Sequence, residues 1–161
     1  MADTAGSLRG AVLAERLEEA GRALIAVARR VDPADWRRVA SAGVWSTGRD
    51  AAHVAEATLL HQWMVRRTIG ERVPSQRPTI ERTELITAMA PTEVAELIRK
   101  RTLEGVTLLR GLTDEQLDLP TQPPRGRGEL LGRTVERVLI GHYDTHRSEI
   151  ERKLRRADRA R

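Results

Sequence analysis

Histidine is the residue type in this chain whose positions most directly suggest chemistry. There are only four, His53, His61, His142 and His146. In a helix, His142 and His146 lie about 40° apart on one face, one turn above the other, because they are four positions apart. Both imidazoles can then reach one ion at about 2.0–2.1 Å from each nitrogen. The pair therefore predicts metal binding if its helical face points inward.

The face that carries this pair is otherwise apolar. Residues at steps of three or four continue the stripe on both sides of the two histidines: Val135, Leu139, Ile150 and Leu154. Such a stripe is the buried face of an amphipathic helix, so the two imidazoles should point into the protein.

His53 occupies a similar position on another helical segment, on one face with Ala57, Leu60 and Met64. A buried imidazole is costly unless its nitrogens find partners, and three on core faces suggest a shared partner. We therefore predict a metal site formed by His53, His142 and His146. The alternative is that each is an ordinary core histidine with a partner of its own.

Two carboxylates and the fourth histidine lie near these ligands in sequence. Glu56 and Glu149 each follow a proposed ligand by three positions and are candidates to orient an imidazole or carry a proton. The alternative for both is a surface carboxylate. His61 lies about 80° around the helix from His53, so we predict that it is a surface or edge residue, with a place in the lining of the site as the alternative.

Four long amphipathic segments position these side chains, and no segment shows the alternation of a strand, so the fold class is predicted to be all-α. The predicted helices cover residues 8–30, 47–69, 91–111 and 129–156. Thr47 as N-cap and Asp50 three positions later resemble a capping box, Trp45 can pack back onto the bundle, and Gly70 is a natural stop. Four such helices predict a four-helix bundle, an architecture that places metal ligands on facing helices.

The connections are predicted from proline and glycine. A short turn around residues 34–36 follows the first helix, and a capping box starting at Thr113 predicts another. Residues 70–90 form a long crossover between the second and third helices, with an extra helical turn within 81–89, and residues 119–128 form a loop.

Composition limits the chemistry. The sequence has no Cys, which excludes disulfides, thiolate metal sites and a cysteine nucleophile. Its length predicts one domain over residues 1–161. No segment reaches the apolar length of a signal peptide or a membrane span, so we expect a cytoplasmic protein that does not enter a membrane.

The net charge of +5 is concentrated at the end of the chain. Residues 147–161 hold seven basic and three acidic side chains. Such a basic helix end suits the negative end of the helix dipole and is usually solvated. We therefore do not expect a nucleic-acid partner.

Two motifs resemble a known family. The stretch WSTGRDAAHVAE, residues 45–56, is similar to the opening of the second helix in the DinB-like (YfiT-like) superfamily, and GHYDTH, residues 141–146, is similar to its H-x-x-x-H on the fourth helix. The order and separation of the motifs and the long second crossover extend the resemblance over nearly the whole chain.

This resemblance implies an up-down-down-up four-helix bundle, often a homodimer, with His53, His142 and His146 as ligands of a divalent metal. Relatives include thiol-dependent enzymes such as mycothiol-dependent maleylpyruvate isomerase and mycothiol or bacillithiol transferases. Larger relatives carry a further C-terminal domain; this chain ends after the fourth helix, so we do not expect their fused activities.

Three neutral imidazoles leave a coordination position open, as in catalytic zinc sites. A metal there activates a thiol or a water molecule. The leading hypothesis is a metal-dependent transferase or isomerase that uses a low-molecular-weight thiol on an electrophilic small molecule. A metal-dependent hydrolase and a non-catalytic binding protein are the alternatives. Zinc is the first choice of metal, and nickel, iron and manganese suit the same donors.

Overall fold

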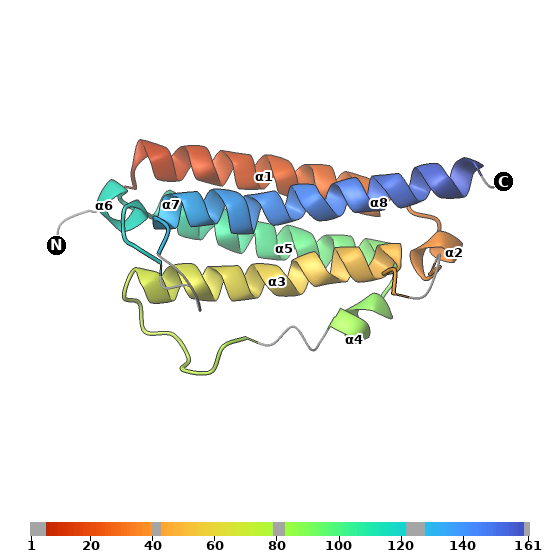
Figure 1. The fold of residues 1–161 in the computed structure, drawn as a ribbon, viewed down its shortest axis with the longest axis horizontal. Coiled ribbons are helices and arrows are strands. Elements are labelled where there is room, and N and C mark those ends of the chain that lie inside the picture. Colours follow the sequence, from red (N-terminus) through yellow and green to blue (C-terminus); the bar gives the residue numbers. More distant parts are fainter. Residues whose placement is uncertain (1–5, 40–42, 79–82, 122–127, 160–161) are drawn as a thin grey trace.

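Four long helices lie side by side in the part of the chain that the structure describes (Figure 1). The structure is a computed structural model and describes residues 6–39, 43–78, 83–121 and 128–159. The long helices are α1 (Leu8–Ala28), α3 (Thr47–Thr68), α5 (Pro91–Arg110) and α8 (Gly141–Arg159). The predicted all-α four-helix bundle is confirmed.

Short helices occupy three of the connections: α2 (Pro33–Trp36), α4 (Thr83–Thr87) and α6 (Asp114–Leu117). Two further segments, α7 (Leu131–Thr134) and the π-helical η1 (Val135–Ile140), lead directly into α8. Residues 122–127 of the predicted 119–128 loop lie outside the described residues, as do 81 and 82 of the predicted extra turn. None of the helices in the described ranges is both long and apolar enough to cross a membrane.

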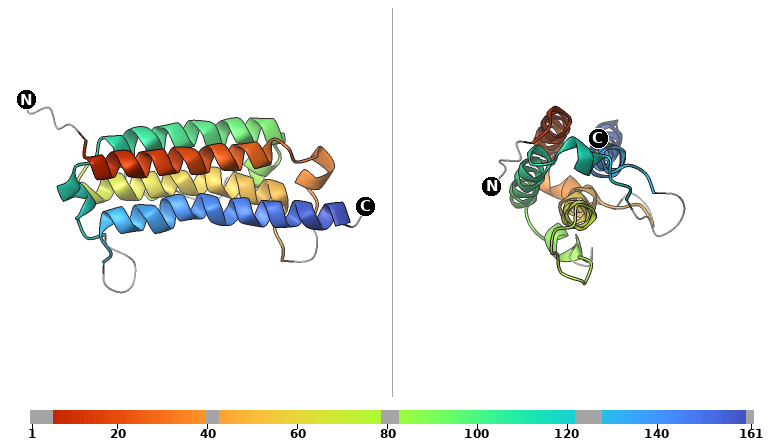
Figure 2. Two further views of the ribbon diagram at one scale, coloured as in Figure 1. Left: turned by 90° about the horizontal axis from the view of Figure 1, so that it is seen from above. Right: turned by 90° about the vertical axis from the view of Figure 1, so that its left-hand side faces the viewer.

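The helix directions follow the up-down-down-up order. α1 and α8 run one way and α3 and α5 the other, and each long helix packs against two neighbours, as the end-on view in Figure 2 shows. α3 and α5 are parallel because the crossover after Gly70 returns along the length of the bundle before α5 begins (Figure 1). Gly70 has a φ of +80°, a conformation that favours glycine, so its predicted role as the stop after α3 is confirmed.

The predicted N-cap of α3 is wrong by one residue. Ser46, not Thr47, is the cap, and its hydroxyl accepts a hydrogen bond from the Arg49 backbone N–H at 3.1 Å. Both residue types cap helices well, so the pattern alone did not distinguish them. Asp50 consequently takes no part in a capping box, and its buried carboxylate is available for contacts inside the bundle.

Trp36 holds the start of α3 close to α2. Its ring lies over Gly48, where an added Cβ would come within 2.7 Å of the indole. The indole N–H donates to the Met89 carbonyl at 3.1 Å, which ties the residue before α5 to the same end of the bundle.

The last helix differs from the prediction in its start and its winding. It begins at Leu131 rather than residue 129, and η1 separates α7 from α8. Val135, Leu139 and Ile140 are all buried, at spacings of four and five, and a wider π turn allows this. The π segment ends at Ile140, two residues before His142.

Candidate metal centre

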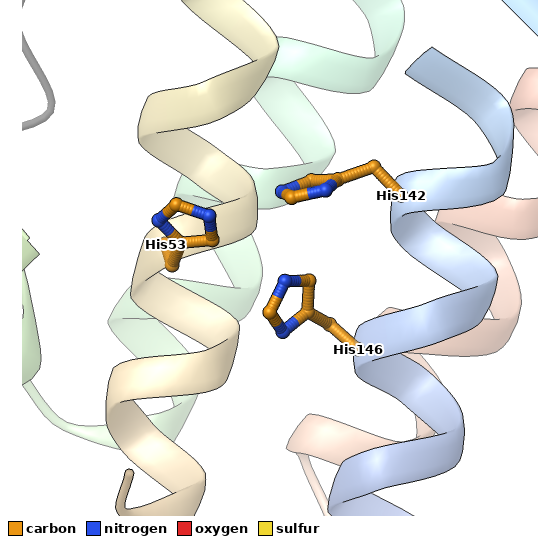
Figure 3. Close-up of side chains that lie close together, drawn as sticks. All are labelled: His53, His142 and His146. Carbon is orange, nitrogen blue, oxygen red and sulfur yellow. The ribbon is translucent and has the colours of Figure 1, made fainter. Parts of the chain in front are cut away.

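Three imidazoles from two helices meet inside the bundle. His53 comes from α3, and His142 and His146 come from α8 and point toward it (Figure 3). Their ring centroids lie 4.5–5.1 Å apart. One nitrogen from each ring falls in a set whose members are all within 4.8 Å of one another. Tetrahedral zinc separates its donors by about 3.3 Å, so small side-chain rotations would bring the three nitrogens onto one ion.

Tyr143 fixes the position of α8 along the bundle axis beside the histidine cluster. It is fully buried, and its hydroxyl lies 3.0 Å from the Thr58 hydroxyl on α3 and 3.2 Å from the Thr102 hydroxyl on α5. Burial raises the pKa of the tyrosine, so it remains a neutral hydrogen-bonding group. The residue next to His142 thus joins three helices and holds the ligand-bearing turn in register with α3.

The environment keeps His53 and His142 neutral. Burial, with smaller contributions from His146, His61 and His53, lowers the pKa of His142 to about 3. Burial and the neighbouring His146 also lower the pKa of His53. A neutral imidazole carries the free lone pair that a metal requires, so at pH 7 these two rings are in the ligating form.

Asp50 orients His146. It is only 3% exposed and lies three positions before His53, and its Oδ1 accepts a hydrogen bond from the Nδ1–H of His146 at 3.0 Å. That tautomer leaves the Nε2 lone pair of His146 free. The other oxygen of Asp50 accepts from the Lys153 ammonium, which also donates to the Trp45 carbonyl at 2.7 Å. A carboxylate that fixes the tautomer of an imidazole is a frequent partner of metal-binding histidines.

Trp45 covers the same end of the cluster. Its ring lies edge-on to His53 at 4.9 Å and stacks with His146 at 6.0 Å. The predicted packing of Trp45 onto the bundle thus brings it against two proposed ligands, where it limits access by water.

The donor set fits a divalent metal. His142 Nε2 is buried and has no hydrogen-bond partner among the described residues. A buried polar atom without a partner costs about 1–3 kcal/mol. A metal ion shared with the neighbouring rings would remove that cost.

Comparison with known proteins gives the family. The model of the DinB superfamily matches residues 16–150. The chain belongs to the DinB superfamily. No curated protein sequence matches it. Among solved structures it is similar to YfiT from Bacillus subtilis, with a TM-score of 0.76 and 19% identity over 92% of this chain and 87% of that one. YfiT is described as a probable metal-dependent hydrolase with an unusual four-helix bundle topology; at this identity the likeness shows the fold.

His61 lies inside this DinB-superfamily bundle, so the predicted surface or edge position is wrong. It is 8% exposed, and its ring is perpendicular to that of His142 with centroids 5.4 Å apart. Its Nδ1 is buried without a hydrogen-bond partner among the described residues, and burial lowers its pKa to about 4. Its position four residues after Ala57 is the signal that could have indicated an inward side chain.

The two candidate carboxylates lie in different surroundings. Glu56 is 5% exposed and is therefore not a surface carboxylate. Glu149 is partly exposed and pairs with Arg152 on its own helix, which matches the surface alternative. Asp50 and Lys153 were not predicted as site residues. The i, i+3 spacing of Asp50 and His53 was a usable signal, but the capping-box interpretation had already assigned Asp50 a role.

Proposed function

We propose that this protein is a metal-dependent enzyme whose metal is held by His53, His142 and His146. The observation that carries the proposal is the buried, unpartnered Nε2 of His142 beside two other imidazoles whose donor atoms lie within 4.8 Å. All-imidazole ligation suits zinc first, with nickel, iron and manganese as alternatives. When bound, such an ion acts as a Lewis acid and stabilises the anionic form of a thiol or water.

The chain's own residues orient the ligands and control access to them. Asp50 holds His146 in the tautomer that presents Nε2 to the cluster, and Lys153 offsets the carboxylate charge. Trp45 packs against two of the ligand rings at this end of the site and narrows the approach from that side.

The nucleophile comes from outside the chain. The sequence has no Cys, so a sulfur nucleophile must be a small molecule. We infer a thiol-dependent S-transferase or isomerase that uses a mycothiol-type low-molecular-weight thiol on an electrophilic small molecule. Membership of the DinB superfamily and the motif resemblance to thiol-dependent relatives support this reaction class.

Hydrolysis is the second candidate. It is favoured by the structural similarity to YfiT, described as a probable metal-dependent hydrolase. The same three histidines would serve, with water in place of the thiol. Turnover without added thiol would identify this reaction.

The purified protein tests the proposal in two steps. Elemental analysis should find a divalent metal, and turnover of an electrophilic test substrate such as 1-chloro-2,4-dinitrobenzene should require a thiol. His146→Ala should lose both metal and turnover, whereas Thr145→Ala, an exposed neighbour on α8, should keep both. A fully folded protein that binds no metal would support the non-catalytic alternative instead.

The assembly and location of the enzyme are part of the same proposal. We infer a homodimer, supported by the exposed Leu8 and Val12 on α1 and Leu103 on the adjacent α5. We also infer a cytoplasmic location, where small thiols stay reduced. Sedimentation equilibrium should give twice the chain mass; a monomer at micromolar concentration would contradict the dimer.

A further inference from the structure

A cavity of about 580 Å³ lies between α3, the crossover and the π segment. This volume is within the range of pockets that bind small ligands. Its walls come from four parts of the chain that are far apart in sequence, since Pro120 also contributes. The lining residues that matter here are His61, Trp63, Arg67, Arg77 and Val138.

His61 joins this cavity to the histidine cluster. It lines the cavity, and its ring also lies 5.4 Å from the ring of His142. Val138, on the opposite wall, is one helical turn before His142. The imidazole of His61 thus stands between the cavity and the proposed ligands, at the end of the cluster that Trp45 does not cover.

The lining combines apolar surface with positive charge. Leu60, Met64 and Val138 supply aliphatic surface, and Trp63 supplies an aromatic wall. The charged residues in the lining are two arginines, Arg67 and Arg77, and no carboxylate is among the described lining residues. A guanidinium group binds carboxylates through two parallel N–H donors. The lining is therefore suited to a molecule with an apolar body and an anionic end.

The aromatic wall is held in place. The indole N–H of Trp63 donates to the Pro74 carbonyl at 2.9 Å, which ties the crossover to α3 beside the cavity. The Arg67 guanidinium lies 5.2 Å from the centre of the same ring. This contact orients the cation at the mouth of the cavity without neutralising it.

We propose that this cavity is the substrate pocket of the enzyme and that the substrate is a small amphipathic organic anion. This inference rests on the proposed metal-dependent function. Arg67 follows His61 by six residues, about 9 Å along the helix. The anionic group of the substrate therefore pairs with Arg67 and Arg77, and its reactive end, about 9 Å away, lies beside His61, next to the histidine cluster.

Two matched probes test the charge preference. Binding of 3-phenylpropionate and of its neutral amide, 3-phenylpropionamide, to the zinc-loaded protein is followed by NMR at the indole N–H of Trp63, assigned with Trp63→Phe. The carboxylate should bind more than tenfold more tightly than the amide, because only the carboxylate pairs with both arginines. Arg67→Gln should weaken carboxylate binding about tenfold and leave amide binding unchanged. Arg72→Gln removes the same charge from an exposed crossover residue outside the cavity and should change neither.

A paramagnetic metal tests the link to the cluster. With Mn²⁺ in place of zinc, the phenyl protons of bound 3-phenylpropionate should broaden strongly, because the cavity borders the ligands. Absence of broadening, equal affinity for the two probes, or no effect of Arg67→Gln would overturn the pocket assignment.

The same experiments separate the two proposals. A protein that binds metal but shows no carboxylate preference would overturn the pocket and leave the catalytic function standing. A protein that binds no metal yet prefers the carboxylate would overturn the catalytic function and leave an anion site.

Discussion

The two ends of the histidine cluster differ in how their polar atoms are satisfied. At one end Asp50 accepts from both His146 and Lys153, and Lys153 reaches a backbone carbonyl as well. At the other end, His142 Nε2 and His61 Nδ1 are buried without partners among the described residues. We call the end with Asp50, Lys153 and His146 the positioning side, and the end with His142 and His61 the receiving side. Buried polar atoms without partners are retained where a ligand can pair with them, so we expect a ligand to bind at the receiving side.

The largest effect should come from removing a receiving-side ligand. His142→Ala takes away one of three nitrogens, so bound metal should fall to background after dialysis against a weak chelator, together with metal-dependent turnover. Thr145→Ala, treated in parallel, should keep its metal. Full retention of metal by His142→Ala, measured by elemental analysis, would contradict the three-histidine site.

The positioning side should have a smaller effect on the same property. Asp50→Ala removes the acceptor that fixes His146 and leaves Lys153 without its partner, so metal affinity should fall about 10–100-fold. Asp50→Asn keeps an oxygen acceptor and should lose less. Chelator competition measures both, with Asp144→Ala on the exposed face of α8 as the control. Equal affinity in all three variants would show that Asp50 does not orient the ligand.

Stability should respond in opposite directions to two neighbouring substitutions. His61→Phe replaces an unpartnered buried nitrogen with carbon and should raise the free energy of unfolding by about 1 kcal/mol in chelator. Gln62→Leu removes the 2.8 Å hydrogen bond that Gln62 Nε2 donates to the Arg101 carbonyl. This substitution should lower the free energy of unfolding by about 1 kcal/mol. Urea unfolding measures both. A clear loss of stability in His61→Phe would contradict the expected cost of the unpartnered nitrogen.

The metal-free protein should also lose stability as the pH falls. The pKa of His61 is lowered to about 4 and that of His142 to about 3, so between pH 6.5 and these values the unfolded chain binds more protons than the folded one. The stability that the protein gains from keeping these two histidines neutral is fully present above pH 6.5. It is lost as the pH falls toward 4. His61→Phe should show a shallower fall in urea midpoint over this range; an unchanged slope would contradict the assignment to His61.

The elements that carry the ligands were predictable because their apolar stripes are regular. The stripe through Val135, His142 and Ile150 placed two histidines inward, and the stripe through His53 and Ala57 placed the third. The convergence of the rings required only that these two faces meet. That requirement follows from the up-down-down-up order implied by the family resemblance.

The details missed were those that depend on tertiary contacts. Ser46 and Thr47 both suit an N-cap, and the packing of Trp36 on Gly48 in the first turn of α3 is a contact that no local pattern records. The π turn before His142 depends on how Val135, Leu139 and Ile140 share the core. The angle of His61 from His53 on an isolated helix does not show that His142 on α8 packs against its ring in the bundle.

The proposed ligands come from helices that are distant in sequence, since His53 and His142 lie 89 positions apart. A cation held by both acts as a reversible crosslink between the second and last long helices, and native-state binding raises stability by RT ln(1 + [M]/Kd). The melting temperature should therefore follow the free metal concentration, which makes thermal unfolding a measure of metal affinity even before a substrate is known.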